Sequence, residues 1–144
     1  DGGVALDALA REAERLVGPA PAHLVGHSFG TLVGLHFTRQ WRSRTFICPT
    51  FAAASIDGGA FCAAIGARIG IDPAAAAPQV AQAIARKAGP LPAPRWSDAD
   101  LVCLPDDDPY FEYVPPPGVA FQRYRGGHFD VSAPMAALAL RLGA

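Results

Sequence analysis

Three residue types that together carry out acyl transfer follow one another along this chain. Ser28 comes first, an acidic run at 106–108 follows, and His128 comes last. A serine hydroxyl is a poor nucleophile until a histidine accepts its proton, and the imidazole in turn needs a carboxylate to hold its tautomer. We therefore expect Ser28 to be a nucleophile, His128 its base, and one of the aspartates the group that orients the histidine.

Ser28 lies within Gly-His-Ser-Phe-Gly at 26–30, the spacing of a nucleophile elbow. The serine of an elbow sits on a strained turn from strand to helix, so we expect a side chain on either Gly26 or Gly30 to collide with backbone. The backbone N–H of Phe29 is then the predicted oxyanion donor. A plain tight turn would not account for the apolar strand pattern before the motif and the helical pattern after it.

His128 is favoured over the other histidines by its position in a glycine-rich loop after a predicted strand. His27 lies inside the elbow, and His23 lies in a predicted strand. His36 falls two helical turns beyond Ser28. Only His128 is therefore expected to reach the serine hydroxyl.

The acid is left as a ranked choice among Asp106, Asp107 and Asp108. The three carboxylates cannot all approach one imidazole, and a run of like charges is also typical of a solvated turn. Asp108 is the first choice and Asp107 the second.

Strand and helix patterns alternate along the chain, which predicts a parallel sheet. The carboxyl ends of parallel strands meet at one crevice, so the three distant residues can come together there. The predicted strands are 23–25, 45–48, 101–104 and 119–124, and the predicted helices are 6–17, 31–42, 60–69, 73–87 and 135–142.

Several local features of these elements can also be predicted. Gly30 and Gly34 share one helical face, which would let that helix lie close to the sheet. Ser132 is the expected N-cap of the last helix, and Gly143 ends it. The prolines within 110–118 exclude a regular helix there.

Composition limits the function classes. The chain has 144 residues, 51% hydrophobic and 17% charged, which predicts one globular domain. A net charge of −1 with scattered basic residues argues against nucleic acid and anionic membranes as partners. The three cysteines lack metal-ligand spacing, so we expect reduced core cysteines and no metal site. No membrane span or leader pattern is found, and the expected location is cytoplasmic.

At the segments 23–30, 107–109 and 126–129 the chain resembles the thioesterases of polyketide and non-ribosomal peptide assembly lines, within the α/β hydrolases. The resemblance is closest to the stand-alone editing form, type II. It implies that Ser28, Asp108 and His128 fill the three triad roles. The other form of the family carries its acid just after the strand that follows the elbow helix, and 47–50 has no carboxylate here, which favours Asp108.

The resemblance implies that the serine takes an acyl group from phosphopantetheine on an acyl or peptidyl carrier protein. No cofactor of the enzyme itself is implied. The fold would be an α/β-hydrolase-like parallel sheet flanked by helices, forming one domain over 1–144, with 51–96 as a helical lid. Residues of the lid that suit an acyl chain, and equally a core, are Phe61, Ile65, Ile69, Ile71, Val80 and Ile84.

Only 27 residues precede Ser28, whereas the family has a run of strands and a second oxyanion loop there. We therefore expect a fold truncated in its N-terminal half, with one sheet edge unpaired unless an N-terminal segment or a second chain completes it. Two other functions stay open. One is a carboxylesterase or acyltransferase with the same triad, and the other is a non-catalytic scaffold that docks a carrier protein.

Overall fold

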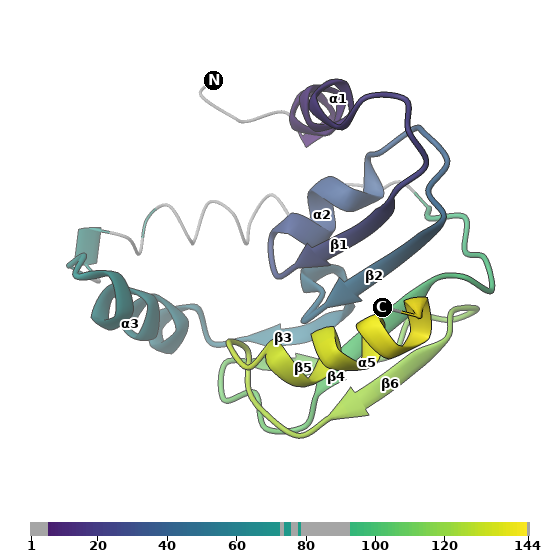
Figure 1. The fold of residues 1–144 in the computed structure, drawn as a ribbon. Helices are drawn as coiled ribbons and strands as arrows, with labels where there is room; N and C mark the ends of the chain where they lie inside the picture. The colour runs from purple at the N-terminus through teal and green to yellow at the C-terminus, as the bar shows by residue number, and fades with distance from the viewer. Residues whose placement is uncertain (1–5, 73, 76–77, 79–92, 144) are drawn as a thin grey trace.

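A four-stranded parallel sheet forms the centre of the molecule (Figure 1). The computed structural model describes residues 6–72, 74–75, 78 and 93–143. The strand order is β1-β2-β4-β6, with bounds His23–His27, Ser43–Ile47, Leu101–Pro105 and Phe121–Tyr124. Every neighbouring pair is parallel, so the four carboxyl ends lie at the same edge. The predicted parallel sheet is confirmed.

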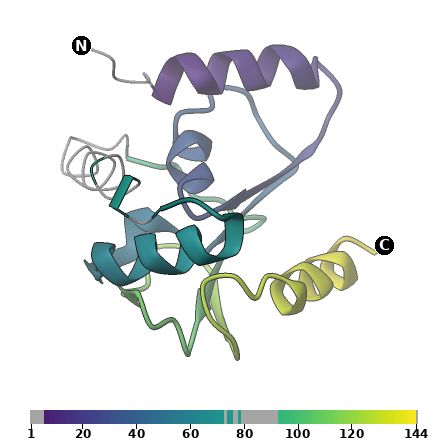
Figure 2. The same cartoon turned by 90° about the vertical axis from the view of Figure 1, so that its left-hand side faces the viewer.

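Helices cover both faces of this sheet (Figure 2). In this view α1 and α2 lie on one side of the sheet and α5 on the other, while α3 stands beyond the carboxyl ends of the strands. The bounds are Leu6–Val17 for α1, Gly30–Leu35 for α2, Gly58–Ile69 for α3 and Ser132–Leu142 for α5. A single 3-10 turn, η1, spans Thr50–Ala52.

The core lies around β2 and β4. All five residues of β4 are buried, as are four of the five in β2. Such continuous burial is expected of central parallel strands covered on both faces. Its largest fully buried apolar side chains are Phe46, Ile47, Leu104 and Val102. The three cysteines are free and buried, as the sequence predicts.

A second, two-stranded sheet was not predicted. β3 (Ala53–Ile56) pairs antiparallel with β5 (Phe111–Tyr113). The segment 110–118 indeed forms no helix, but Phe111, Glu112 and Tyr113 alternate buried, exposed and buried, which is the pattern of a strand with one covered face. This pairing joins the region after β2 to the region after β4.

The helix after the elbow is shorter than predicted. Residues 31–42 were expected to be helical, but α2 ends at Leu35. The carboxylate of Glu14 accepts hydrogen bonds from the backbone N–H groups of Thr38 and Arg39, at 2.6 and 2.8 Å. These N–H groups are therefore satisfied from α1 rather than by a continued helix.

The two glycines of α2 differ in their surroundings. A Cβ on Gly34 would lie 2.9 Å from the ring of Phe46, which confirms the predicted close approach of helix and sheet. A Cβ on Gly30 would meet nothing within 4 Å. The prediction that the missing side chain lets the helix lie close to the sheet is therefore wrong for Gly30.

Helix ends follow the predictions in part. Gly143 ends α5 in the left-handed conformation, with φ of 74°, as expected. Ser132 is not its N-cap, because the helix already includes Ser132 and Val131 holds the cap position without a side-chain hydrogen bond. Asp57 caps α3 through its side chain, which accepts from Ala60 N–H at 3.0 Å.

Part of the predicted lid falls within the described chain, where it forms η1, β3 and α3. The predicted helix at 73–87 lies mostly outside the described residues, as do Val80 and Ile84. β1 is an edge strand of the four-stranded sheet. It pairs with β2 and with no other strand of the described ranges. No helix in the described part of the chain is long and apolar enough to cross a membrane.

Candidate active site

Ser28 lies on a strained turn between β1 and α2. Its φ is 51°, in the left-handed region that residues with a side chain rarely occupy. Its backbone N–H donates to the carbonyl of Ile47 on β2 at 3.0 Å, and its carbonyl accepts from the N–H of Thr31 at 3.0 Å. The neighbouring strand and the first turn of α2 therefore hold the strained conformation in place.

The two glycines flanking this turn have unequal roles. A Cβ on Gly26 would lie 3.2 Å from both the carbonyl oxygen of Gly30 and the Cα of Thr31. The predicted collision is therefore confirmed at Gly26, whereas Gly30 has open space around it and the prediction is wrong there. Phe29 lies between Ser28 and the first residue of α2, and its backbone N–H stays the proposed oxyanion donor.

The structure brings Ser28, His128 and Asp108 into one line of contacts. Nε2 of His128 lies 2.8 Å from Oγ of Ser28, and Nδ1 lies 3.0 Å from Oδ2 of Asp108. The side chains of His128 and Asp108 are 0% and 1% exposed. A carboxylate only accepts hydrogen bonds, so a neutral imidazole that donates to Asp108 carries its proton on Nδ1, and its Nε2 can then accept from the serine.

Asp108 is held as a carboxylate by several donors. Its Oδ1 accepts from the N–H groups of Tyr110 and Phe111, at 2.9 and 3.2 Å, and its Oδ2 accepts from Tyr113 as well as His128. Burial is the largest influence on its pKa and raises it, but the hydrogen bonds from His128, Tyr110 and Tyr113 together outweigh burial and bring the pKa below its ordinary value.

The other two aspartates point elsewhere. Asp106 forms an exposed ion pair with Arg123 at 3.6 Å, and Asp107 is one of the residues that line a cavity beside the loop of His128. The structure therefore places Asp108, and neither neighbour, against the imidazole.

The His128 ring lies within a cluster of aromatic side chains. Phe111 stacks on it at 4.6 Å between centroids, and Phe61 and Phe129 meet it edge-on at 4.9 and 5.2 Å. Nε2 of His27 donates to the backbone carbonyl of His128 at 2.8 Å. The base is thus held at both its ring and its backbone, and His27 contacts the backbone of His128.

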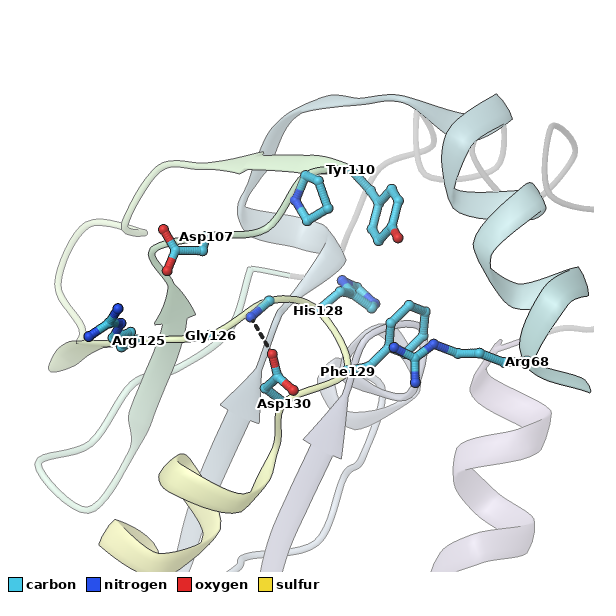
Figure 3. A pocket seen from close by; sticks show the side chains of 10 residues that line it. Arg68, Asp107, Tyr110, Arg125, Gly126, His128, Phe129 and Asp130 are labelled. Atoms are coloured by element: carbon cyan, nitrogen blue, oxygen red, sulfur yellow. Dashed lines mark hydrogen bonds between the residues drawn. The ribbon is translucent and has the colours of Figure 1, made fainter.

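A cavity of about 370 Å³ opens beside His128 (Figure 3). Tyr110 and Phe129 form its apolar wall, and the guanidinium of Arg68 from α3 lies 4.3 Å from the centre of the Phe129 ring. Gly127 also lines the cavity, and its N–H donates to Asp130 at 2.8 Å. The cavity adjoins the face of the loop that carries the proposed base.

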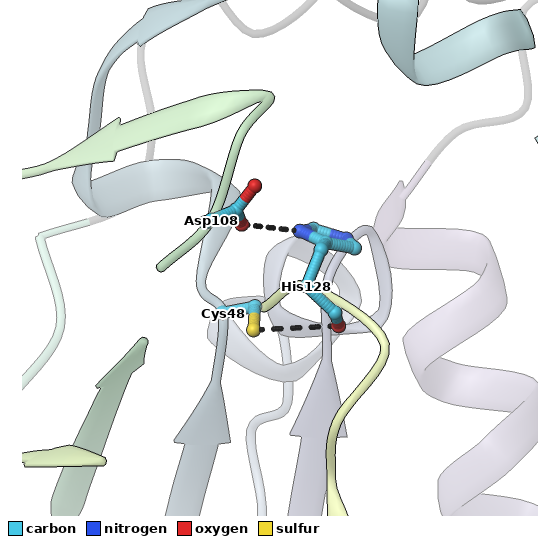
Figure 4. Close-up of side chains that lie close together, drawn as sticks. All are labelled: Cys48, Asp108 and His128. Atoms are coloured by element: carbon cyan, nitrogen blue, oxygen red, sulfur yellow. Dashed lines mark hydrogen bonds and ion pairs between the residues drawn. The ribbon is translucent and has the colours of Figure 1, made fainter. Parts of the chain in front are cut away.

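Cys48 was not singled out from the sequence as a site residue, yet it lies beside His128 and Asp108 (Figure 4). Ligand atoms of the three residues lie within 4.8 Å of one another. A metal would need the thiolate, but burial raises the Cys48 pKa to about 11, and the thiol donates to the His128 carbonyl at 3.6 Å. This donor chemistry favours a hydrogen-bonded cluster over a metal site.

Tyr113 was also missed. Its hydroxyl touches both Asp108 and His128, yet it reaches them only because β5 pairs with β3. The alternation of 111–113 was the one local signal for that strand.

Comparisons with known proteins agree with this architecture. Residues 2–143 match the model of the Alpha/beta hydrolase family. The sequence matches no curated protein. One similar solved structure is a covalent complex of the NocB thioesterase domain with a fluorophosphonate nocardicin G analog, with a TM-score of 0.66 and 18% identity over 100% of this chain and 77% of that one. Human thioesterase 2 is similar with a TM-score of 0.57 and 9% identity, over 96% of this chain and 77% of its own. At these identities the likeness shows the fold alone.

Proposed function

We propose that this chain, which belongs to the alpha/beta hydrolase family, is a serine hydrolase that releases acyl groups from thioesters. The observation that carries the proposal is the unbroken line of contacts from Ser28 Oγ to His128 Nε2 and from His128 Nδ1 to Asp108 Oδ2. In this arrangement the serine proton has an acceptor within hydrogen-bond reach, and the acceptor has a fixed tautomer.

The proposed reaction begins with acylation of the serine. Ser28 Oγ attacks the thioester carbonyl carbon while His128 Nε2 takes the hydroxyl proton. The Phe29 N–H stabilises the negative oxygen of the tetrahedral intermediate. The carbon–sulfur bond then breaks, and His128 returns its proton to the leaving sulfur, so that a free thiol departs and an acyl ester remains on Ser28. Asp108 stabilises the imidazolium throughout.

Deacylation reverses the roles. A water molecule attacks the ester carbon while His128 Nε2 accepts its proton. The bond to Ser28 Oγ breaks, His128 protonates that oxygen, and a carboxylic acid leaves. The same base serves both halves, so its loss would stop the reaction at either half.

The proposed substrate is an acyl group on the phosphopantetheine of an acyl or peptidyl carrier protein, as in the editing thioesterases that the sequence resembles. The two solved structures described above are named as thioesterases, which supports thioester chemistry in this proposal. In this proposal the enzyme acts in the cytoplasm and uses no cofactor of its own.

Hydrolysis of an acyl-pantetheine, compared with that of the matched oxygen ester, tests the proposal. We expect the thioester to have the higher kcat/KM. Ser28→Ala should lose about 10³-fold or more, while the surface variant Ser132→Ala keeps the wild-type rate. A higher kcat/KM for the oxygen ester would indicate a carboxylesterase. Turnover of neither substrate, with a carrier protein still bound, would indicate a scaffold.

A further inference from the structure

The hydroxyl of Tyr113 lies where the carboxylate of Asp108 meets the ring of His128. Tyr113 Oη is 2.9 Å from Asp108 Oδ2 and 3.1 Å from His128 Nδ1, and these two atoms are 3.0 Å apart. The three polar atoms therefore form a closed triangle, buried beneath the aromatic ring of Phe111.

Only two protons are available to this triangle, and their placement decides the state of the base. If the phenol donates to Asp108, then Nδ1–H also donates to Asp108, and Nε2 is unprotonated toward Ser28. If the phenol donated to Nδ1, the neutral imidazole would carry its proton on Nε2 and could not accept the serine proton. The negative charge on Asp108 favours the first arrangement, because it attracts both donors.

We propose that Tyr113 is a positioning residue that orients the Asp108 carboxylate and keeps His128 in the tautomer with Nε2 free to act as base. The inference rests on the proposed function, since it concerns the same serine, histidine and aspartate.

The surroundings of Tyr113 support this role. Burial raises the pKa of its phenol far above the ordinary value, so the hydroxyl keeps its proton and donates. The other titratable groups around the triangle come from three strands: His27 from β1, Cys48 after β2, and Tyr124 at the end of β6. Burial also raises the pKa of Cys48 and of Tyr124, so both stay neutral. Asp108 is therefore the negatively charged group to which the phenol of Tyr113 donates.

Backbone contacts hold both partners of this hydrogen bond, the acceptor Asp108 and the donor Tyr113. Asp108 Oδ1 is occupied by the N–H groups of Tyr110 and Phe111, which turns Oδ2 toward the imidazole. The pairing of Tyr113 with Ala53, across β5 and β3, anchors the strand that presents the phenol. Removing the hydroxyl would leave Oδ2 with His128 as its one side-chain donor among the described residues.

The test compares Tyr113→Phe with Tyr124→Phe in the full chain. Tyr124 is a matched control because it is equally buried, and its hydroxyl contacts Cys48 Sγ at 3.0 Å rather than the triad atoms. We expect Tyr113→Phe to lower kcat by about 10- to 100-fold with KM within about twofold. The acid limb of its kcat/KM profile should move to higher pH, because a carboxylate with one donor fewer stabilises the charged imidazolium more strongly. Tyr124→Phe should change neither.

An unchanged kcat and acid limb in Tyr113→Phe would overturn the inference, as would equal effects in the two variants. The nitrogen-15 NMR shifts of His128 in the wild-type protein give a readout that needs neither turnover nor a folded variant. Protonated Nδ1 with unprotonated Nε2 supports the inference, and the opposite tautomer overturns it. A wild-type protein with the expected tautomer but no hydrolysis of any acyl substrate would count against the proposed function alone.

Discussion

The turn that carries Ser28 depends on the absence of one side chain. At Gly26 an added Cβ would press on the Gly30 carbonyl and the Thr31 Cα, both of which are backbone and cannot rotate away. At Gly30 the same addition meets open space. A single residue before the serine, rather than a symmetric pair, therefore keeps β1 and α2 close together.

Gly26→Ala should destabilise the protein by about 1–3 kcal/mol, because the elbow must shift to admit the methyl group. Gly30→Ala is the matched control. It should leave the free energy of unfolding unchanged or raise it by up to about 1 kcal/mol, because alanine has a higher helix propensity than glycine. Denaturant unfolding of the two variants gives both values. An equal loss in the two would contradict the asymmetry of the elbow.

The site could be predicted from the sequence as far as order and local spacing allow. Ser28 and His128 follow from motifs at strand ends, but Asp107 and Asp108 are neighbours whose side chains point in different directions, and spacing ranks them without deciding. Tyr113 depends on a strand pairing between residues about 60 positions apart in sequence, a distance at which local patterns carry no information.

At the scale of elements, the helix starts differ in whether a side chain caps them. Asp57 satisfies an N–H of the first turn of α3, whereas Ser132 lies inside α5 and caps nothing. Both residue types are favoured N-caps, so a sequence pattern alone cannot distinguish the true cap from a serine one position too late.

Asp57→Ala should therefore cost about 1 kcal/mol of stability, through the loss of the hydrogen bond to Ala60 N–H. Ser132→Ala should change stability by less than about 0.5 kcal/mol. Thermal unfolding measures both, and a larger loss for Ser132→Ala than for Asp57→Ala would show that the caps are assigned the wrong way round.

The length of α2 illustrates how one element overrides the pattern of another. The apolar spacing after the elbow is typical of a helix to residue 42, but Glu14 on α1 captures the N–H groups at Thr38 and Arg39. Such a contact between α1 and the chain beyond α2 depends on their packing, which the sequence pattern of either segment does not reveal.

At the scale of the whole molecule, alternating strands and helices were enough to predict the parallel sheet and the edge where the site lies. The buried carboxylate of Asp108 lies at this same edge. Asp108 is ionised there with its pKa below the ordinary value, so its ionisation contributes to folding stability above the unfolded pKa of 3.8. That contribution is lost as pH falls below 3.8 and through the lower pKa of the folded state.

Asp108→Asn should thus be less stable than the wild-type protein at neutral pH. The gap, meaning the difference in free energy of unfolding between the two proteins, should narrow as pH falls below about 3.8, because a protonated Asp108 resembles the amide. Urea unfolding midpoints of the wild-type protein and each variant, measured from pH 7 to pH 2, give this difference. Ser28→Ala is the control, and its difference from the wild-type protein should not depend on pH in this range. A gap for Asp108→Asn that stays constant to pH 2 would contradict the assigned charge.

The central claim is that His128 activates Ser28, and covalent labelling by a fluorophosphonate tests it most directly. Ser28 Oγ would attack phosphorus and expel fluoride while His128 Nε2 takes the proton, which leaves one adduct detectable by intact mass and mapped to the peptide of Ser28. We predict rapid single labelling of the wild-type protein and of the control His36→Ala, and none of His128→Ala at the same exposure. A folded wild-type protein that stays unlabelled, or a His128→Ala variant labelled at the wild-type rate, would contradict the account.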